Sequence, residues 1–170
     1  GSKDKAKSCF SHIMNGQSTY QGRALYYYAY IQYKDGDYAQ ALKNFQRLEA
    51  SKNSDQKLRK IAQCYIVRIY YYLGKEDEFL QMAPILMEDK EDPLKSELQE
   101  MMGEVYFNRG EYAQALKHYR KAEAILATEQ KSDDNKQLAG GKGQKRLSYD
   151  NAYQVGYSYY MLHNYDSAAA

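Results

Sequence analysis

The sequence predicts an all-α protein built as a solenoid of helical hairpins, and three observations support this fold class. The string GDYAQALKNF, which begins at Gly36, recurs almost unchanged as GEYAQALKHY from Gly110. Gly74 lies midway and also closes an apolar run, so the chain repeats at roughly 37 residues. Only two prolines occur in 170 residues, so long helices meet few breaks. One hairpin cannot bury its apolar face alone, and successive hairpins are therefore expected to stack.

The chain is expected to open with a single helix over residues 4–15. Ala6, Phe10 and Ile13 have the spacing of the second helix of a hairpin whose first helix is missing. The first complete hairpin is predicted over residues 22–53. Gly36 is expected to end its first helix, because glycine adopts a left-handed backbone at the least cost.

The second hairpin, over residues 58–90, departs from the pattern of the others. Val67 stands where the first helix elsewhere has a small residue, and Phe79 stands where the second helix has alanine. This hairpin is therefore expected to be splayed. Pro84 falls within its second helix, and we expect a kink there because proline removes a backbone donor.

The third hairpin is predicted over residues 93–127, with Gly103 facing Ala115 so that the two helices approach closely. Residues 128–148 are polar, contain glycine and have no apolar period, which predicts a flexible insertion. The glycine cluster of this segment differs from a phosphate-binding loop in two ways. No Ser or Thr follows its lysine, and no predicted strand precedes it. A partial fourth hairpin is predicted over residues 149–170.

In the fourth hairpin, the small position of the first helix is held by Gly156, which is expected to face Ala168. His163 takes the place of the turn glycine there. Tyrosines begin the second helices and are expected to wedge between a hairpin and its neighbour. These tyrosines are Tyr38, Tyr112 and Tyr165.

The third hairpin also carries a recognisable set of residues: Met102, Gly103, Tyr106, Gly110, Tyr112, Ala115, Tyr119 and Ala122. This set resembles a complete tetratricopeptide repeat (TPR). The resemblance implies pairs of antiparallel helices, A and B, stacked into a right-handed superhelix whose concave face is lined by A helices. It predicts a single array of about eight helices with a short C-terminal stub.

A ligand groove is predicted on the inward positions of the A helices. The spacing of Tyr26, Tyr30 and Tyr33 places three rings on one helix face without reference to any family. The inward positions of the TPR pattern supply the rest. The predicted groove residues are Arg23, Tyr26, Tyr30, Tyr33, Arg68, Tyr71, Glu100, Glu104, Phe107, Tyr153, Tyr157 and Tyr160. Tyrosine also packs such repeats together, so these rings either contact a ligand or serve packing.

Composition argues against several other classes of function. With 24 Lys and Arg against 22 Asp and Glu, the chain lacks the excess of positive charge expected of a protein that binds nucleic acid. No apolar run reaches the roughly 18 residues of a membrane span. His12, His118 and His163 lie in different units without a second ligand one helical turn away, so no metal is predicted. No cofactor and no catalytic residues are predicted.

The leading hypothesis is a non-catalytic scaffold that binds a protein or peptide in the tyrosine-rich groove. As an alternative, the stretch from Tyr153 to Tyr160, with Phe45 to Leu48, is similar to TPR proteins of the bacterial cell envelope, of the outer-membrane assembly lipoprotein and Tol-Pal-associated types. That resemblance implies a periplasmic or envelope location; otherwise the cytoplasm is expected. A second alternative is the sensory segment of a larger signalling protein. Because both ends stop within a repeat, exposed helix surface is expected to favour self-association.

Overall fold

The computed structural model describes residues 1–15, 20–51, 54–88, 94–134 and 149–168; within 129–134, 149 and 164–168 it describes the helix without its side chains. The described residues form eight helices and no strand, which confirms the all-α class. The helices are α1 (Ser2–Met14), α2 (Gln21–Lys34), α3 (Tyr38–Glu49), α4 (Gln56–Tyr72), α5 (Glu76–Leu86), α6 (Lys95–Asn108), α7 (Tyr112–Asp134) and α8 (Tyr149–Ala168).

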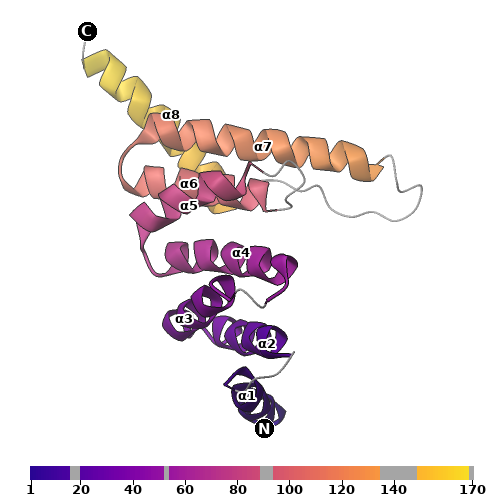
Figure 1. Ribbon diagram of the computed structural model, residues 1–170. Helices are drawn as coiled ribbons and strands as arrows, with labels where there is room; N and C mark the ends of the chain where they lie inside the picture. Colours follow the sequence, from indigo (N-terminus) through magenta and orange to yellow (C-terminus); the bar gives the residue numbers. More distant parts are fainter. Residues whose placement is uncertain (16–19, 52–53, 89–93, 135–148, 169–170) are drawn as a thin grey trace. The chain divides into compact units, whose positions relative to one another are not determined.

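The helices pack in chain order within two compact units, Gly1–Leu86 and Met87–Ala170. In the first unit, α1, α2, α3 and α4 each pack against the next, and α4 packs against α5 (Figure 1). In the second unit, α6 packs against α7 and α7 against α8. In addition, α2 contacts α4 and α6 contacts α8. Within each unit the A helices of neighbouring hairpins therefore adjoin, as expected for stacked repeats.

Glycine ends three of the A helices in the same way. Gly36, Gly74 and Gly110 have φ of 78°, 65° and 76°. After α2, the Asp37 amide donates to the Gln32 carbonyl at 2.9 Å, the bond that closes a helix C-terminus around a left-handed residue. The same bond recurs from Lys75 to Tyr70 at 2.9 Å and from Glu111 to Tyr106 at 2.8 Å. The predicted glycine turns are confirmed.

The small residue Gly103 on α6 leaves room for a residue of the following B helix, α7. A Cβ built on Gly103 would lie 2.6 Å from the Tyr119 ring, so the missing side chain is replaced by that ring. The prediction named Ala115 as the neighbour of Gly103; the closest side-chain atoms belong to Tyr119 instead. Any side chain larger than that of glycine would overlap the Tyr119 ring, because the interior is close-packed.

Residue size at this pair of positions varies in opposite directions from hairpin to hairpin. The pairs are Ala29 with Phe45, Val67 with Ala83 and Gly103 with Tyr119, and their members are buried in every case. A larger residue on the A helix thus accompanies a smaller one on the B helix, which conserves volume. At the equivalent positions of the second hairpin, the larger Val67 is matched by the smaller Ala83. That the second hairpin is splayed stays a prediction.

Helix α5 contains Pro84 and ends two residues later, at Leu86. Proline cannot donate the backbone bond that would hold it to the preceding turn, so a helix past this point is weakened. The Pro84 ring is exposed, whereas Phe79 and Ala83 on the same helix are fully buried. Helix α5 is thus packed against the rest of its unit mainly through Phe79 and Ala83, which precede Pro84.

Two helices run further than the sequence predicts. Helix α7 continues to Asp134, into the region expected to be an insertion, because residues 128–134 contain neither glycine nor proline to stop it. The rest of that insertion, residues 135–148, lies outside the described residues. The start predicted at residue 93 also lies outside them, and α6 begins at Lys95.

Helix α8 continues through His163 to Ala168, so the turn predicted at His163 is wrong. A histidine has a Cβ and enters the left-handed conformation only at a cost, unlike the glycines of the other turns. No B helix therefore begins at Tyr165. Gly156 is exposed, and no atom of the described residues lies within 4 Å of an added Cβ; the side chain of Ala168 lies outside the described residues, so the approach of Gly156 to Ala168 stays a prediction.

Candidate functional site

In the first unit, the three predicted tyrosines of α2 gather around one ring of α4. The centroid of the Tyr65 ring lies 6.2 Å from that of Tyr26, 5.8 Å from that of Tyr30 and 5.1 Å from that of Tyr33. Tyr65 also stacks on the fully buried Phe45, with centroids 4.8 Å apart. These rings therefore help to pack α2 against α4.

Two hydroxyl groups of this cluster, those of Tyr65 and Tyr33, have raised pKa values. Burial raises the pKa of Tyr65 to about 12, and its hydroxyl forms a hydrogen bond with that of Tyr26. Burial likewise raises the pKa of Tyr33, helped by the nearby Tyr72. These two hydroxyl groups therefore stay protonated at neutral pH and can donate as well as accept hydrogen bonds.

Cations border the first-unit cluster. The Arg68 guanidinium lies over the Tyr65 ring at 5.8 Å, and the Lys34 amine lies 6.0 Å from the centroid of Tyr30. Arg23 is exposed near the start of α2. Such contacts between a cation and a ring face are favourable because the face of the ring is electron-rich. The border of this cluster is therefore basic.

The predicted residue Tyr71 contacts a different part of the unit. Its ring lies 5.6 Å from that of buried Phe79, on α5. Tyr72 joins the cluster instead, stacking on Tyr38 at 5.0 Å and lying 6.2 Å from Tyr33. The TPR pattern places Tyr72 as well as Tyr71 at inward positions and assigns Tyr65 to packing; spacing alone did not reveal that Tyr65 lies at the centre of this cluster.

The wedging role predicted for the tyrosines that begin B helices is confirmed in both units. Tyr38 lies 5.6 Å from Tyr33 of its own hairpin and contacts Tyr72 of the next. Tyr112 lies 5.6 Å from Phe107 of its own hairpin and 6.0 Å from Tyr157 of α8. The side chain of Tyr165, the third tyrosine of this prediction, lies outside the described residues.

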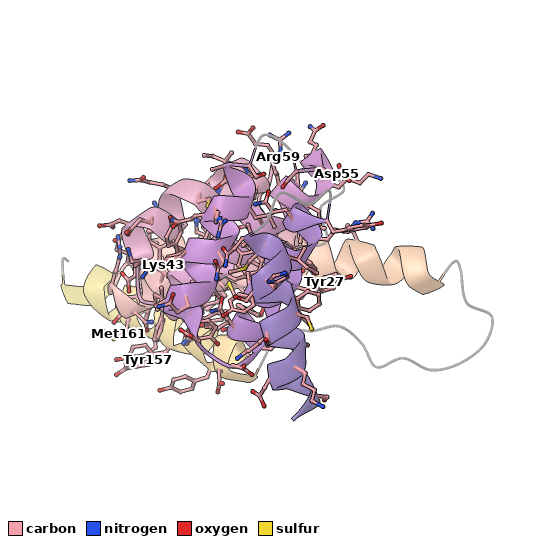
Figure 2. All side chains as sticks on the ribbon, turned by 60° about the horizontal axis from the view of Figure 1, so that its bottom comes forward. Tyr27, Lys43, Asp55, Arg59, Tyr157 and Met161 are labelled. Carbon is pink, nitrogen blue, oxygen red and sulfur yellow. The ribbon has the colours of Figure 1, made fainter. Side chains whose placement is uncertain are left out.

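In the second unit, three predicted tyrosines form an exposed row on α8, which we call the α8 stripe: Tyr153, Tyr157 and Tyr160. Tyr153 stacks on Tyr157 at 6.2 Å, and Tyr160 lies 6.3 Å from Tyr157. Tyr153 is 69% exposed and Tyr160 is 62% exposed. Tyr157, which lies one turn from Met161 (Figure 2), also contacts Phe107 of α6 at 5.7 Å. The stripe thus continues onto α6 through Phe107.

Acidic side chains of α6 lie close to α8 at residues other than those of the stripe, namely Asn151 and Gln154. Glu100 accepts a hydrogen bond of 2.7 Å from the Asn151 amide, and burial raises the pKa of its carboxyl group. The Tyr119 hydroxyl donates to Gln154 of α8. Burial raises the pKa of Tyr119, and the nearby carboxylates of Glu104 and Glu100 raise it further. The second unit therefore combines exposed rings with negative charge.

The predicted groove residues fall into two groups, one in each unit. The first group is Arg23, Tyr26, Tyr30, Tyr33, Arg68 and Tyr71; the second is Glu100, Glu104, Phe107, Tyr153, Tyr157 and Tyr160. Contacts within each group are described above. That both groups line one groove stays a prediction.

The described part of the chain offers few other kinds of site. It contains no group of three or more His, Cys, Asp or Glu placed to hold a metal ion. None of its helices combines the length and the apolar character needed to cross a membrane. Aromatic surface is thus the most prominent chemical feature of the described residues.

Comparison with known proteins assigns the family. A family model described as a tetratricopeptide repeat-like domain matches residues 2–139, which include α1 to α7. Comparison with curated proteins gave no match, and comparison with solved structures gave none. The recurring glycine turns and wedging aromatic residues agree with the family match. The chain therefore belongs to the tetratricopeptide repeat-like domain family.

Proposed function

We propose that this chain is a non-catalytic scaffold that binds a protein or peptide partner through its tyrosine-rich surface, centred on the α8 stripe. Membership of a tetratricopeptide repeat-like family suggests protein interaction, and repeat domains of this kind are generally non-catalytic. The observation that carries the proposal is the exposure of Tyr153 and Tyr160 on one face of α8. Groove binding by both units together is part of the same proposal.

The α8 stripe has the physical properties of a recognition surface. Tyrosine offers a large apolar ring and a hydroxyl that can form hydrogen bonds, and it loses little conformational freedom on binding. Tyr153 and Tyr160 each make a ring contact with Tyr157, and Tyr157 is anchored by Phe107 and Tyr112. The stripe is thus held in place on one side and open on the other, which lowers the entropy cost of binding.

The first unit supports a smaller share of this role. Tyr26, Tyr30 and Tyr33 are half-buried against the core of that unit. Their replacement would therefore disturb folding as well as binding. The exposed rings of α8 are the better place to separate the two effects.

A peptide-display selection tests the proposal. Random peptides are selected against the immobilised chain and against the double variant Tyr153→Ala with Tyr160→Ala. We expect ligands of the native chain to bind the double variant about tenfold more weakly, because both rings are lost from the contact surface. The melting temperature should change little, because substitutions at exposed positions typically alter stability by about 0.5 kcal/mol or less.

Tyr159→Ala is the matched control. Tyr159 lies on the same helix and is 46% exposed, but its ring packs against Arg120 rather than against the stripe. We expect this variant to bind the selected peptides as the native chain does. Recovery of the same peptides at equal affinity by the double variant would contradict the proposal, and so would a large loss of its stability.

The envelope adaptor and the sensory segment are two narrower versions of this function. Both would use the same stripe, and they differ in where the protein works and what it is attached to. Locating the protein in fractionated cells separates them. A protein found only in the cytosol would exclude the envelope version.

A further inference from the structure

We infer that the α8 stripe binds a helical segment of a partner protein in which an aromatic residue is followed, three residues later, by Arg or Lys. The inference rests on the proposed function and adds the chemistry of the partner. It is drawn from the way the same chain covers an equivalent row of tyrosines elsewhere.

The chain contains two rows of tyrosines with the same spacing. Tyr26, Tyr30 and Tyr33 on α2 repeat the i, i+4, i+7 pattern of the α8 stripe. Tyr26 stacks on Tyr30 with centroids 6.1 Å apart and planes 17° apart. Tyr153 stacks on Tyr157 with centroids 6.2 Å apart and planes 29° apart. The two rows therefore present similar surfaces to whatever lies against them.

The row on α2 is contacted along its length by one ring of α4, that of Tyr65, and Arg68 of the same helix lies near enough to Tyr33 to influence its hydroxyl. Tyr65 contacts the rings of all three tyrosines, at 6.2, 5.8 and 5.1 Å. Arg68, three residues later and on the same helix face, lies over the Tyr65 ring at 5.8 Å. An aromatic residue with Arg one turn later is thus a combination that this surface accommodates.

The row on α8 is not covered in this way. Tyr153 and Tyr160 are mostly exposed, and among the described residues no cation lies over any ring of the stripe. Tyr159, just off the stripe, has Arg120 over its ring at 5.4 Å. The face that remains open is therefore the one whose counterpart on α2 holds an aromatic residue and a cation.

Charge at the α8 stripe favours a basic partner. Glu104 and half-buried Glu100 lie on α6 near Tyr119, whose hydroxyl donates to Gln154 of α8, and neither forms an ion pair with another described residue. Asp150, which is exposed, precedes the stripe at the position that Arg23 holds before the row on α2. A Lys or Arg of the partner would meet these carboxylates, as well as the electron-rich ring faces.

Three matched peptides test the inference directly. Each is an amide-capped, alanine- and glutamine-based helix of about 16 residues, long enough to be helical in water. They carry Tyr-x-x-Arg, Tyr-x-x-Gln or Ala-x-x-Arg at the centre and a fluorescein label for anisotropy. We expect Tyr-x-x-Arg to bind the native chain about tenfold more tightly than either of the other two, because each of them lacks one of the two favourable contacts.

Variants of the chain identify the surface that binds. The double variant Tyr153→Ala with Tyr160→Ala should weaken binding of Tyr-x-x-Arg about tenfold, and Tyr159→Ala should not. Glu104→Gln should weaken binding of Tyr-x-x-Arg about threefold and leave Tyr-x-x-Gln unchanged, because only the former carries the charge. Glu123→Gln removes a charge from an exposed position on α7 and is the matched control.

Equal binding of the three peptides would overturn the inference, and so would full binding by the double variant. Concentration-dependent dimerisation that the double variant abolishes would also overturn it, since a second copy would then be the occupant. The peptide-display selection distinguishes failure of this inference from failure of the proposed function. Ligands that need the stripe but lack the aromatic and basic pair would leave the proposed function standing and end this inference.

Discussion

His118 is a buried titratable side chain in the interior of the second unit. Its ring is 8% exposed, stacks on Tyr106 at 5.2 Å, and has Nδ1 2.7 Å from the Gln99 amide oxygen, to which it donates. Burial lowers the pKa of His118 to about 4, and the neighbouring Lys121 and Lys117 contribute to this. The imidazolium form is thus disfavoured while α6 and α7 stay packed.

This environment predicts an acid dependence of stability. Between the ordinary pKa of 6.5 and the folded value of about 4, the unfolded chain binds a proton that the folded ring does not. The free energy of unfolding should therefore fall as the pH falls through this window, by up to about 3 kcal/mol, and level off below it. His118→Gln should flatten that part of the profile because it does not titrate.

The measurement is urea unfolding followed by circular dichroism from pH 7 to pH 4 at constant ionic strength. His12→Gln is the matched control, since it removes a histidine from an exposed position on α1. Other groups also titrate in this range, so the difference between native chain and variant is the informative quantity. Identical slopes for the native chain and His118→Gln would contradict the prediction.

At the scale of the helix, glycine serves different purposes at Gly110 and Gly156. Gly110 has φ of 76°, and an added Cβ would meet no atom within 4 Å. Replacing Gly110 with another residue therefore lowers stability through the strain of placing a side chain on a left-handed backbone. Gly156 lies within α8, has no positive φ and is also open around its Cα. Its replacement would remove only the helix-weakening effect of glycine.

Opposite changes in stability are therefore expected from the same substitution. Gly110→Ala should lower the free energy of unfolding by about 1–2 kcal/mol. Gly156→Ala should raise it by about 0.5–1 kcal/mol, because alanine loses less backbone entropy on forming a helix. Thermal unfolding of the two variants beside the native chain measures both. A destabilised Gly156→Ala would indicate a packing role that the surroundings of Gly156 do not suggest.

These helices also show which features the sequence could predict. The turns at Gly36, Gly74 and Gly110 were predictable because a left-handed residue is a local requirement that glycine meets best. The turn at His163 was not, since position in the repeat was given more weight than the residue itself. The contact between Gly103 and Tyr119 was also missed, because a close approach depends on side chains of another helix rather than on local pattern.

At the scale of the whole molecule, the rings of the candidate site were predictable and their surroundings were not. The spacing of Tyr26, Tyr30 and Tyr33 placed them on one face of α2, and that of the α8 stripe did the same there. Spacing does not reveal that Tyr65 covers the first row while the second is open. Coverage depends on which helix comes next, and that is a property of packing between repeats.

A chain of stacked repeats is stabilised by contacts between neighbours, and a local defect should therefore stay local. Gly103→Ala provides such a defect, because the new methyl group would meet the fully buried Tyr119 ring at 2.6 Å. Overpacking typically costs about 1–3 kcal/mol, offset in part by the better helix propensity of alanine. We expect the loss to fall on the second unit, Met87–Ala170.

Hydrogen exchange measured by mass spectrometry tests this directly. Amides of α6 and α7 should exchange faster in Gly103→Ala than in the native chain, and so should those of α8, which Tyr119 joins through Gln154. Amides of α2 and α3 should be unchanged, because their core is built within the first unit from residues such as Leu25, Phe45 and Leu48. Gly156→Ala, with open space around its methyl group, is the matched control. Faster exchange throughout α2 and α3 would mean that the two units unfold as one, because a defect confined to the second core can reach the first only if their stabilities are coupled.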